Sequence, residues 1–213
     1  MPSSLPVTPH LPLDHYDWPL IGRQLDAEGW ALLPGFFPPD AVRQLTQTGN
    51  TATLEALRPL LYRRLLPIAR AWADALQLDA SYPDDFPTWL LHNRNAGQTR
   101  PLTAIQRLTQ DGYQPLAQHA DGEAVFPLQL VALLSDPETA FTGGEFVMTE
   151  QRPRMQSRPM VLPLRCGDAA IIAVSHRPVQ GAQNVYRVTA RQAISRVRAG
   201  QRVGLELLLH DGR

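Results

Sequence analysis

The spacing of apolar residues changes character about halfway along this chain of 213 residues. In the N-terminal half, apolar residues recur at three- and four-residue steps, as on the buried face of a helix. The helices that this spacing predicts lie at 19–28, beginning at 38–45, over 53–78 and around 89–91. Pro59 and Pro67 are expected to kink or divide the longest of them. A single strand is predicted at 30–33.

The C-terminal half contains short runs of β-branched and aliphatic residues, separated by turn signals such as Asp111-Gly112 and Ala199-Gly200. The strands that these runs predict lie at 102–109, 113–118, 125–135, 144–150, 160–165, 168–174, 184–190, 193–198 and 201–210. Many short strands at this spacing are typical of an antiparallel sandwich or barrel. The chain therefore combines a helical first half with a β-rich second half.

The length and composition indicate one globular domain. Hydrophobic residues make up 44% of the chain, which is enough to form a buried core. Residues 1–17 contain four prolines and little periodic pattern, so we expect a flexible tail there. The expected domain spans 18–213, with helical support at 18–97 and a β core at 98–211.

The charge balance and the cysteine content argue against several classes of function. Lys and Arg together number 20, as do Asp and Glu, which argues against strong non-specific attraction to nucleic acid or to a membrane surface. Cys166 is the single cysteine, so neither an intramolecular disulfide nor a cysteine-based zinc site can form. No signal peptide or membrane-spanning apolar run is visible, and we expect a cytoplasmic protein with no membrane partner.

The tripeptide His119-Ala120-Asp121, just before the apolar run at 125–134, carries the clearest chemical signal. An imidazole and a carboxylate two residues apart at the mouth of a strand can both point at one ion. With a distant third ligand they form the triad of two histidines and one carboxylate found in non-haem Fe(II) oxygenases. That triad leaves metal positions open for a bidentate cosubstrate and O2.

Several further motifs follow the tripeptide in order. They are an apolar strand at 126–134, Gly-Gly-Glu-Phe at 143–146, Gly167-Asp168 and Gly200-Gln201-Arg202. This order resembles the Fe(II)- and 2-oxoglutarate-dependent dioxygenases, most closely their prolyl-hydroxylase-like branch. The resemblance covers roughly 28–211 and implies an α+β fold, in which N-terminal helices pack on a double-stranded β-helix (jelly-roll) core.

Other segments narrow the resemblance to a small bacterial family of such oxygenases, which has been associated with oxidative demethylation of damaged nucleic acid. These segments lie at 96–101, 151–158, 176–179 and 195–202. The resemblance implies Fe(II), O2 and the cosubstrate 2-oxoglutarate. It also implies that His119 and Asp121 bind the metal. Arg202 would pair with the distal carboxylate of 2-oxoglutarate, and Tyr113 would donate its hydroxyl to the same group.

The third metal ligand is the point at which this chain departs from the pattern. The prolyl-hydroxylase-like enzymes carry a distal His about ten residues before the basic residue, and Gln192 stands there in this chain. Two alternatives remain open. His176, 55 residues after Asp121, can replace the distal ligand. Otherwise the triad is incomplete, and the protein binds metal weakly or keeps the fold without the chemistry.

Three classes of function are compatible with these observations. The first is a dioxygenase that hydroxylates, or demethylates through hydroxylation, a nucleobase, a protein side chain or a small molecule. The second is a non-catalytic β-helix module that binds a ligand or partner. The third is a cupin-like metal-binding protein that does not use 2-oxoglutarate. Two basic stretches, each of which is either a solvated surface or part of a nucleic-acid groove, comprise Arg152, Arg154, Arg158, Arg187, Arg191, Arg196 and Arg198.

Overall fold

The helical half of the chain forms largely as its apolar spacing predicts. The structure, a computed structural model, describes residues 13–152 and 155–213. Its helices are the 3-10 helix η1 (Leu13–His15), α1 (Trp18–Glu28), α2 (Pro39–Thr48), α3 (Ala52–Glu55), α4 (Leu57–Ala75) and α5 (Phe86–Asn95). Asp17 begins α1 by accepting a hydrogen bond from the backbone N–H of Leu20, and Gly29 ends it in the left-handed conformation (φ 77°).

Prolines interrupt the helices less than expected. Pro59 lies in the first turn of α4, where a missing N–H costs no helical hydrogen bond, and α4 continues through Pro67. The helix predicted at 53–78 is instead interrupted at Ala56, between α3 and α4. The tail predicted at 1–17 lies for its larger part outside the described residues. Leu13, within its described part, is buried in the core.

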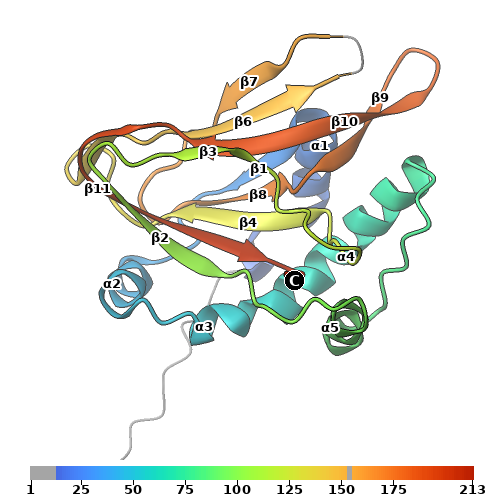
Figure 1. The fold of residues 1–213 in the computed structure, drawn as a ribbon, viewed down its shortest axis with the longest axis horizontal. Helices are drawn as coiled ribbons and strands as arrows, with labels where there is room; N and C mark the ends of the chain where they lie inside the picture. The colour runs from blue at the N-terminus through green and yellow to red at the C-terminus, as the bar shows by residue number, and fades with distance from the viewer. Residues whose placement is uncertain (1–12, 153–154) are drawn as a thin grey trace, which may run out of the picture.

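The strands pair antiparallel into two sheets that face each other (Figure 1). Their bounds are β1 (Trp30–Leu33), β2 (Ala104–Thr109), β3 (Gln114–Ala117), β4 (Leu128–Leu133), β5 (Phe141–Gly143), β6 (Phe146–Gln151), β7 (Arg158–Val161), β8 (Ala169–Ala173), β9 (His176–Gln180), β10 (Val185–Ile194) and β11 (Val197–Leu208). The larger sheet has the order β1-β8-β4-β11-β2, with β5 also paired to β11. The smaller sheet has the order β3-β10-β6-β7, with β9 paired to β10. Most neighbouring strands in these sheets are not consecutive in the sequence. This topology confirms the predicted double-stranded β-helix.

Strand boundaries differ from the prediction near the C-terminus. The strands expected at 184–190 and 193–198 are largely replaced by one strand, β10, because its pairing with β6 continues without a break from Thr189 to Ile194. The hairpin strand β9 was not predicted, since Arg177 and a proline interrupt its apolar pattern. The three-residue strand β5 was also missed.

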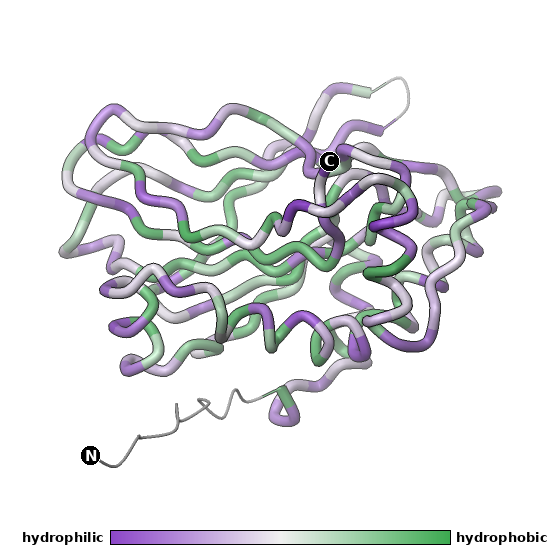
Figure 2. The backbone as a smooth tube through the Cα atoms, turned by 60° about the horizontal axis from the view of Figure 1, so that its bottom comes forward, coloured by the Kyte–Doolittle hydropathy of each residue, from purple (hydrophilic) through white to green (hydrophobic). Residues whose placement is uncertain are grey.

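Apolar side chains fill two layers, one between the sheets and one between the larger sheet and the helices. Residues of β4 alternate between these layers, so the whole strand is buried. The layer between the sheets includes Val131, Leu133, Phe146, Met148, Ile172 and Ile194. Helices α2 to α5 lie below the larger sheet in Figure 1, and Figure 2 shows hydrophobic residues gathered along the central strands. Among the described residues, no helix is both long and apolar enough to cross a membrane.

A buried ion pair connects α1 to the smaller sheet. Arg177 of β9 contacts Glu150 of β6, and their side chains are 0% and 1% exposed. The Arg177 Nη2 donates to Glu150 Oε2 at 2.9 Å, while Nη1 donates to the backbone carbonyl of Asp26 at 2.7 Å. Asp26 lies in the last turn of α1, so this guanidinium also satisfies a helix-end carbonyl.

We expect Arg177→Ala to lower the free energy of unfolding by about 3–5 kcal/mol, because it leaves the Glu150 carboxylate buried without a counter-ion. Urea unfolding measures this loss. Arg158→Ala is the matched control, since its pair with Glu28 is about half exposed on both sides and is worth less than about 1 kcal/mol. Equal losses in the two variants would contradict this account.

Candidate functional site: a polar cluster inside the β-helix

His119 lies just after β3. Its backbone carbonyl is held by His210, which follows β11. The ring of His210 accepts a hydrogen bond at Nδ1 from the backbone N–H of Phe126, at 3.3 Å. Its proton therefore lies on Nε2, which donates to the carbonyl of His119 at 2.8 Å. Gln118 donates to the carbonyls of Ser175 and Ala190, at 3.1 and 2.8 Å. These bonds hold the loop that carries His119 against the strands around it.

Two buried amide side chains from opposite sheets hold the His119 ring, which is 23% exposed. Gln192 Nε2, from β10, lies 2.9 Å from His119 Nδ1, and Gln129 Nε2, from β4, donates to Gln192 Oε1 at 2.7 Å. Gln129 Oε1 lies 3.2 Å from the same Nδ1. The two shorter contacts make Nδ1 an acceptor and place the ring proton on Nε2. Gln192, at the position of the expected distal His, thus supports the His119 ring.

A carboxylate faces the other ring nitrogen. Glu206 Oε2, on β11, lies 3.6 Å from His119 Nε2, and the Glu206 side chain is buried. Gln114 of β3 donates from Nε2 to Glu206 Oε1 at 3.3 Å. Burial raises the pKa of Glu206, while His119, Gln114 and Arg202 act in the opposite direction. We call Gln114, His119, Gln129, Gln192 and Glu206 the interior polar cluster.

The other predicted metal ligands lie outside this cluster. Asp121 is exposed in the loop after His119. His176 begins β9 and is half-buried, and burial, assisted by Arg187, lowers its pKa. Across residues 13–152 and 155–213, no three His, Cys, Asp or Glu side chains form a group able to hold a metal ion. His119, Asp121 and His176 therefore do not form such a group in this structure.

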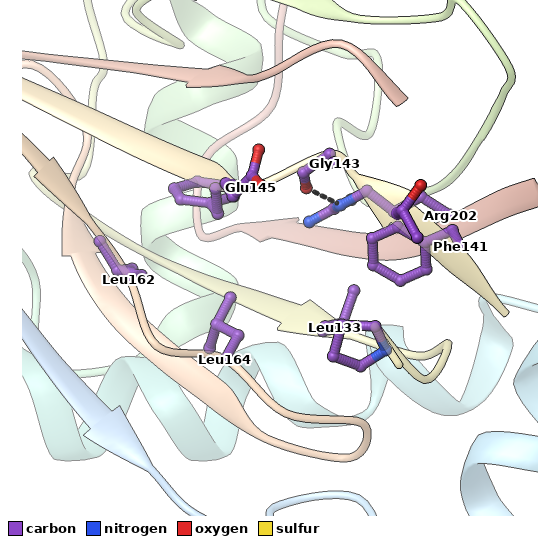
Figure 3. Close-up of a pocket in the computed structure, with 11 residues that line it drawn as sticks. Leu133, Phe141, Gly143, Glu145, Leu162, Leu164 and Arg202 are labelled. Carbon is purple, nitrogen blue, oxygen red and sulfur yellow. Dashed lines mark hydrogen bonds between the residues drawn. The ribbon is translucent and has the colours of Figure 1, made fainter. Parts of the chain in front are cut away.

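Arg202 points from β11 toward a cavity of about 220 Å³, whose apolar lining includes Phe141 and Leu164 (Figure 3). Its Nε donates to the carbonyl of Gly144 at 2.8 Å. Burial lowers the pKa of Arg202 to about 10 against the opposing effect of Glu206, so the guanidinium is cationic at neutral pH. Within the described part of the chain, none of the ion pairs involves Arg202.

The interior between Arg202 and the cluster is tightly filled. The void that Arg202 shares with Glu206, Ile194 and Phe146 is too small to hold a water molecule. The other residue predicted to contact 2-oxoglutarate, Tyr113, is 64% exposed and does not line the cavity beside Arg202.

The chemistry of these side chains suits a divalent cation and an organic carboxylate. His119 Nε2 and the Glu206 carboxylate are donor types that bind divalent transition-metal ions. Gln114 Oε1 is buried and lacks a hydrogen-bond partner among the described residues, so the cluster has an unused acceptor. The guanidinium of Arg202 suits a carboxylate. The donor types therefore fit, although the arrangement differs from the predicted triad.

Sequence reasoning missed Gln129 and Glu206, although a signal was present. Each is the one polar residue in an otherwise apolar stretch, 128–133 for Gln129 and 203–209 for Glu206. A polar residue in a fully buried strand needs a partner, so its presence indicates a polar site in the interior. His210, to which no role was assigned, is also buried and holds the backbone of His119.

We expect acid to destabilise the protein through His210. Burial lowers the pKa of His210 from its usual 6.5 to about 4. Between these two values the unfolded chain binds the proton more readily, so stability falls as the pH drops from about 6.5 toward 4. The contribution lost between pH 7 and pH 5 is about 2 kcal/mol.

Urea unfolding at the two pH values measures this loss, and His210→Gln is the comparison because it removes the titrating group. The variant should lose about 2 kcal/mol less than the natural chain over the same interval. Equal losses would show that His210 is not held neutral in the folded protein.

Comparison with known proteins identifies a family match over most of the chain. The Oxygenase-NA family, described as oxygenases catalysing oxidative methylation of damaged DNA, matches residues 44–212. An uncharacterized protein of Mycobacterium tuberculosis is 40% identical over 158 residues, which cover 74% of this chain and 68% of the relative. This family match confirms the predicted relationship to oxygenases.

Solved structures confirm the predicted fold. A prolyl-4-hydroxylase from Pseudomonas putida matches with a TM-score of 0.53 and 11% identity, covering 93% of each chain. An oxidoreductase of the 2OG-Fe(II) oxygenase family from Burkholderia pseudomallei matches with a TM-score of 0.51 and 17% identity, covering 92% of each chain. Both matches extend over the helical support as well as the β-helix.

Proposed function

The chain belongs to the Oxygenase-NA family, and from this membership we propose that it is a dioxygenase that uses Fe(II), O2 and 2-oxoglutarate. When bound, these groups would supply the oxidation of a substrate C–H bond, coupled to oxidation of 2-oxoglutarate to succinate. The chain's own residues would hold the metal, bind the cosubstrate and exclude water from the interior.

The observation that carries this proposal is the placement of His119 and Arg202 in one β-helix interior. His119 has a ring nitrogen directed into the interior polar cluster, and Asp121 follows it in the same loop. Arg202 is cationic and 2% exposed, and its guanidinium lines the cavity shown in Figure 3. We assign His119 and Asp121 to the metal and Arg202 to the distal carboxylate of 2-oxoglutarate. Tyr113 and His176 remain predictions for the cosubstrate and the third ligand.

For the substrate we propose a damaged nucleic acid, because the family is described by action on damaged DNA. Two arginines of β10, Arg187 and Arg191, are exposed on its outer face, where phosphate groups can reach them. They lie four residues apart on one strand, so they share a face of the smaller sheet. These two side chains would position a phosphate backbone, whereas recognition of the damaged base would fall to other residues.

A second candidate function is a β-helix module that binds a ligand or partner without turnover. Two observations favour it. Gln192, at the distal ligand position, has its amide engaged by Gln129 and His119. The interior between Arg202 and Glu206 is also filled. The measurement below separates this candidate from the oxygenase.

We expect the purified protein, supplied with Fe(II), 2-oxoglutarate and air but no primary substrate, to form succinate slowly. His119→Ala should abolish this turnover, because it removes the imidazole that faces the interior. Binding of 2-oxoglutarate without turnover would indicate an enzyme that requires its primary substrate. Absence of both turnover and Fe(II)-dependent binding would overturn the oxygenase and favour the binding module.

We expect Arg202→Ala to raise the KM for 2-oxoglutarate at least tenfold, a loss on the scale of one charge-assisted hydrogen-bond pair. Arg202→Lys should recover part of this affinity, because it restores the charge but not the bidentate geometry. An unchanged KM in Arg202→Ala would contradict the assignment of Arg202 to 2-oxoglutarate. Metal binding and activity that do not depend on 2-oxoglutarate, and that Arg202→Ala leaves intact, would instead support a cupin-like metal protein.

A further inference from the structure

The carboxylate that faces His119 comes from the opposite wall of the β-helix. His119 follows β3 of the smaller sheet, whereas Glu206 lies on β11 of the larger sheet, where it pairs with Val131 of β4. We propose that Glu206 is a metal ligand that takes the role of the absent distal His, so that His119 and Glu206 hold one divalent ion between the two sheets. This inference rests on the proposed function and specifies its metal site.

The separation of the two donors supports this assignment. Two donors that each lie about 2.1 Å from one divalent ion are roughly 3–4 Å apart. His119 Nε2 and Glu206 Oε2 are 3.6 Å apart, which is longer than a hydrogen bond and within this range. A buried carboxylate beside an imidazole nitrogen is costly unless a proton or a cation lies between them.

The other ring nitrogen already has the partner that a metal-bound imidazole requires. When Nε2 binds a metal, the ring proton lies on Nδ1 and needs an acceptor, which is most often a carbonyl or carboxylate oxygen. Gln129 Oε1 lies 3.2 Å from His119 Nδ1 and can accept that proton. Gln192 Nε2 lies 2.9 Å from the same Nδ1, so metal binding at Nε2 requires the Gln192 amide to move away while Gln129 Oε1 accepts the proton.

The side chain of Gln114, beside Glu206, uses only one of its two polar atoms among the described residues. Gln114 reaches Glu206 Oε1 through its Nε2, but its own Oε1 is buried and unbonded within the described part of the chain. A neutral amide oxygen left unsatisfied next to a carboxylate is stabilised by a cation or by water bound to that cation. The carboxylate and amide oxygens together with one imidazole form a donor set that suits Mn²⁺ as well as Fe²⁺.

Manganese binding by the full chain tests the assignment without any need for turnover. Titration with Mn²⁺, followed through the electron paramagnetic resonance signal of the free ion, gives the affinity of each variant. Glu206→Gln is nearly isosteric and should weaken Mn²⁺ binding at least tenfold, as should His119→Ala. Glu123→Gln removes an exposed carboxylate of the same loop and should leave the affinity unchanged.

The outcomes separate this inference from the proposed function. If Glu206→Gln binds Mn²⁺ as tightly as the natural chain, or more tightly, while His119→Ala does not bind it, Glu206 is not a ligand and the metal site stands without it. If the natural chain binds neither Mn²⁺ nor Fe²⁺, the proposed function fails as well. Thermal unfolding of Glu206→Gln establishes that this variant is folded. Recovery of Mn²⁺ binding when Glu206→Gln is combined with Gln192→His would show that the single variant lost binding because it lost a metal ligand.

Discussion

The alternation of side chains along β11 is the constraint on which the site depends. This strand pairs with β2 on one edge and with β4 on the other, so its register is fixed from both sides. Arg202 and Glu206 therefore face the space between the sheets, while Val203, Leu205 and Leu207 face the helices. A shift of one residue would expose the charged side chains to the apolar layer on the other face, which makes the register strongly specified.

The interior polar cluster is costly to bury, and its hydrogen bonds explain how it is tolerated. Its neighbours between the sheets are apolar, among them Val131, Met148 and Ile194. In such surroundings an unpaired amide or carboxylate would be strongly unfavourable, whereas a connected network offsets the loss of water. Gln129 and Gln192 bond to each other and to His119, which leaves Glu206 facing the imidazole. Gln114 Oε1, beside Glu206, is a buried acceptor without a partner among the described residues, and the proposed cation would lie near it.

The periodic patterns in the sequence predicted most of the fold, because helices and buried strands have different spacings of apolar residues. They predicted α1, β4 and β8 closely, and they placed the helical half before the β-helix. Short strands such as β5 were missed because three residues carry too little periodicity. The division of β10 into two was wrong because pairing with β6, which is a tertiary contact, decides where that strand ends.

The site was only partly predictable for a similar reason. His119 and Arg202 could be selected as candidates because each stands in a local motif at the start or end of a strand. Glu206 and Gln129 come near His119 through the pairing and facing of strands that are far apart in the sequence, and no local motif records this. His176 is the opposite case. Its distance along the chain from Asp121 suits a triad, but the structure does not gather these residues into a metal-binding group.

The most direct test of a metal site shared by the two sheets is a crystal structure of the full chain grown with Mn²⁺, with diffraction recorded for the anomalous signal of manganese. The account predicts one anomalous peak within coordination distance of both His119 Nε2 and the Glu206 carboxylate. A peak bound to His176 instead, or a peak at His119 that leaves Glu206 outside coordination distance, would contradict it.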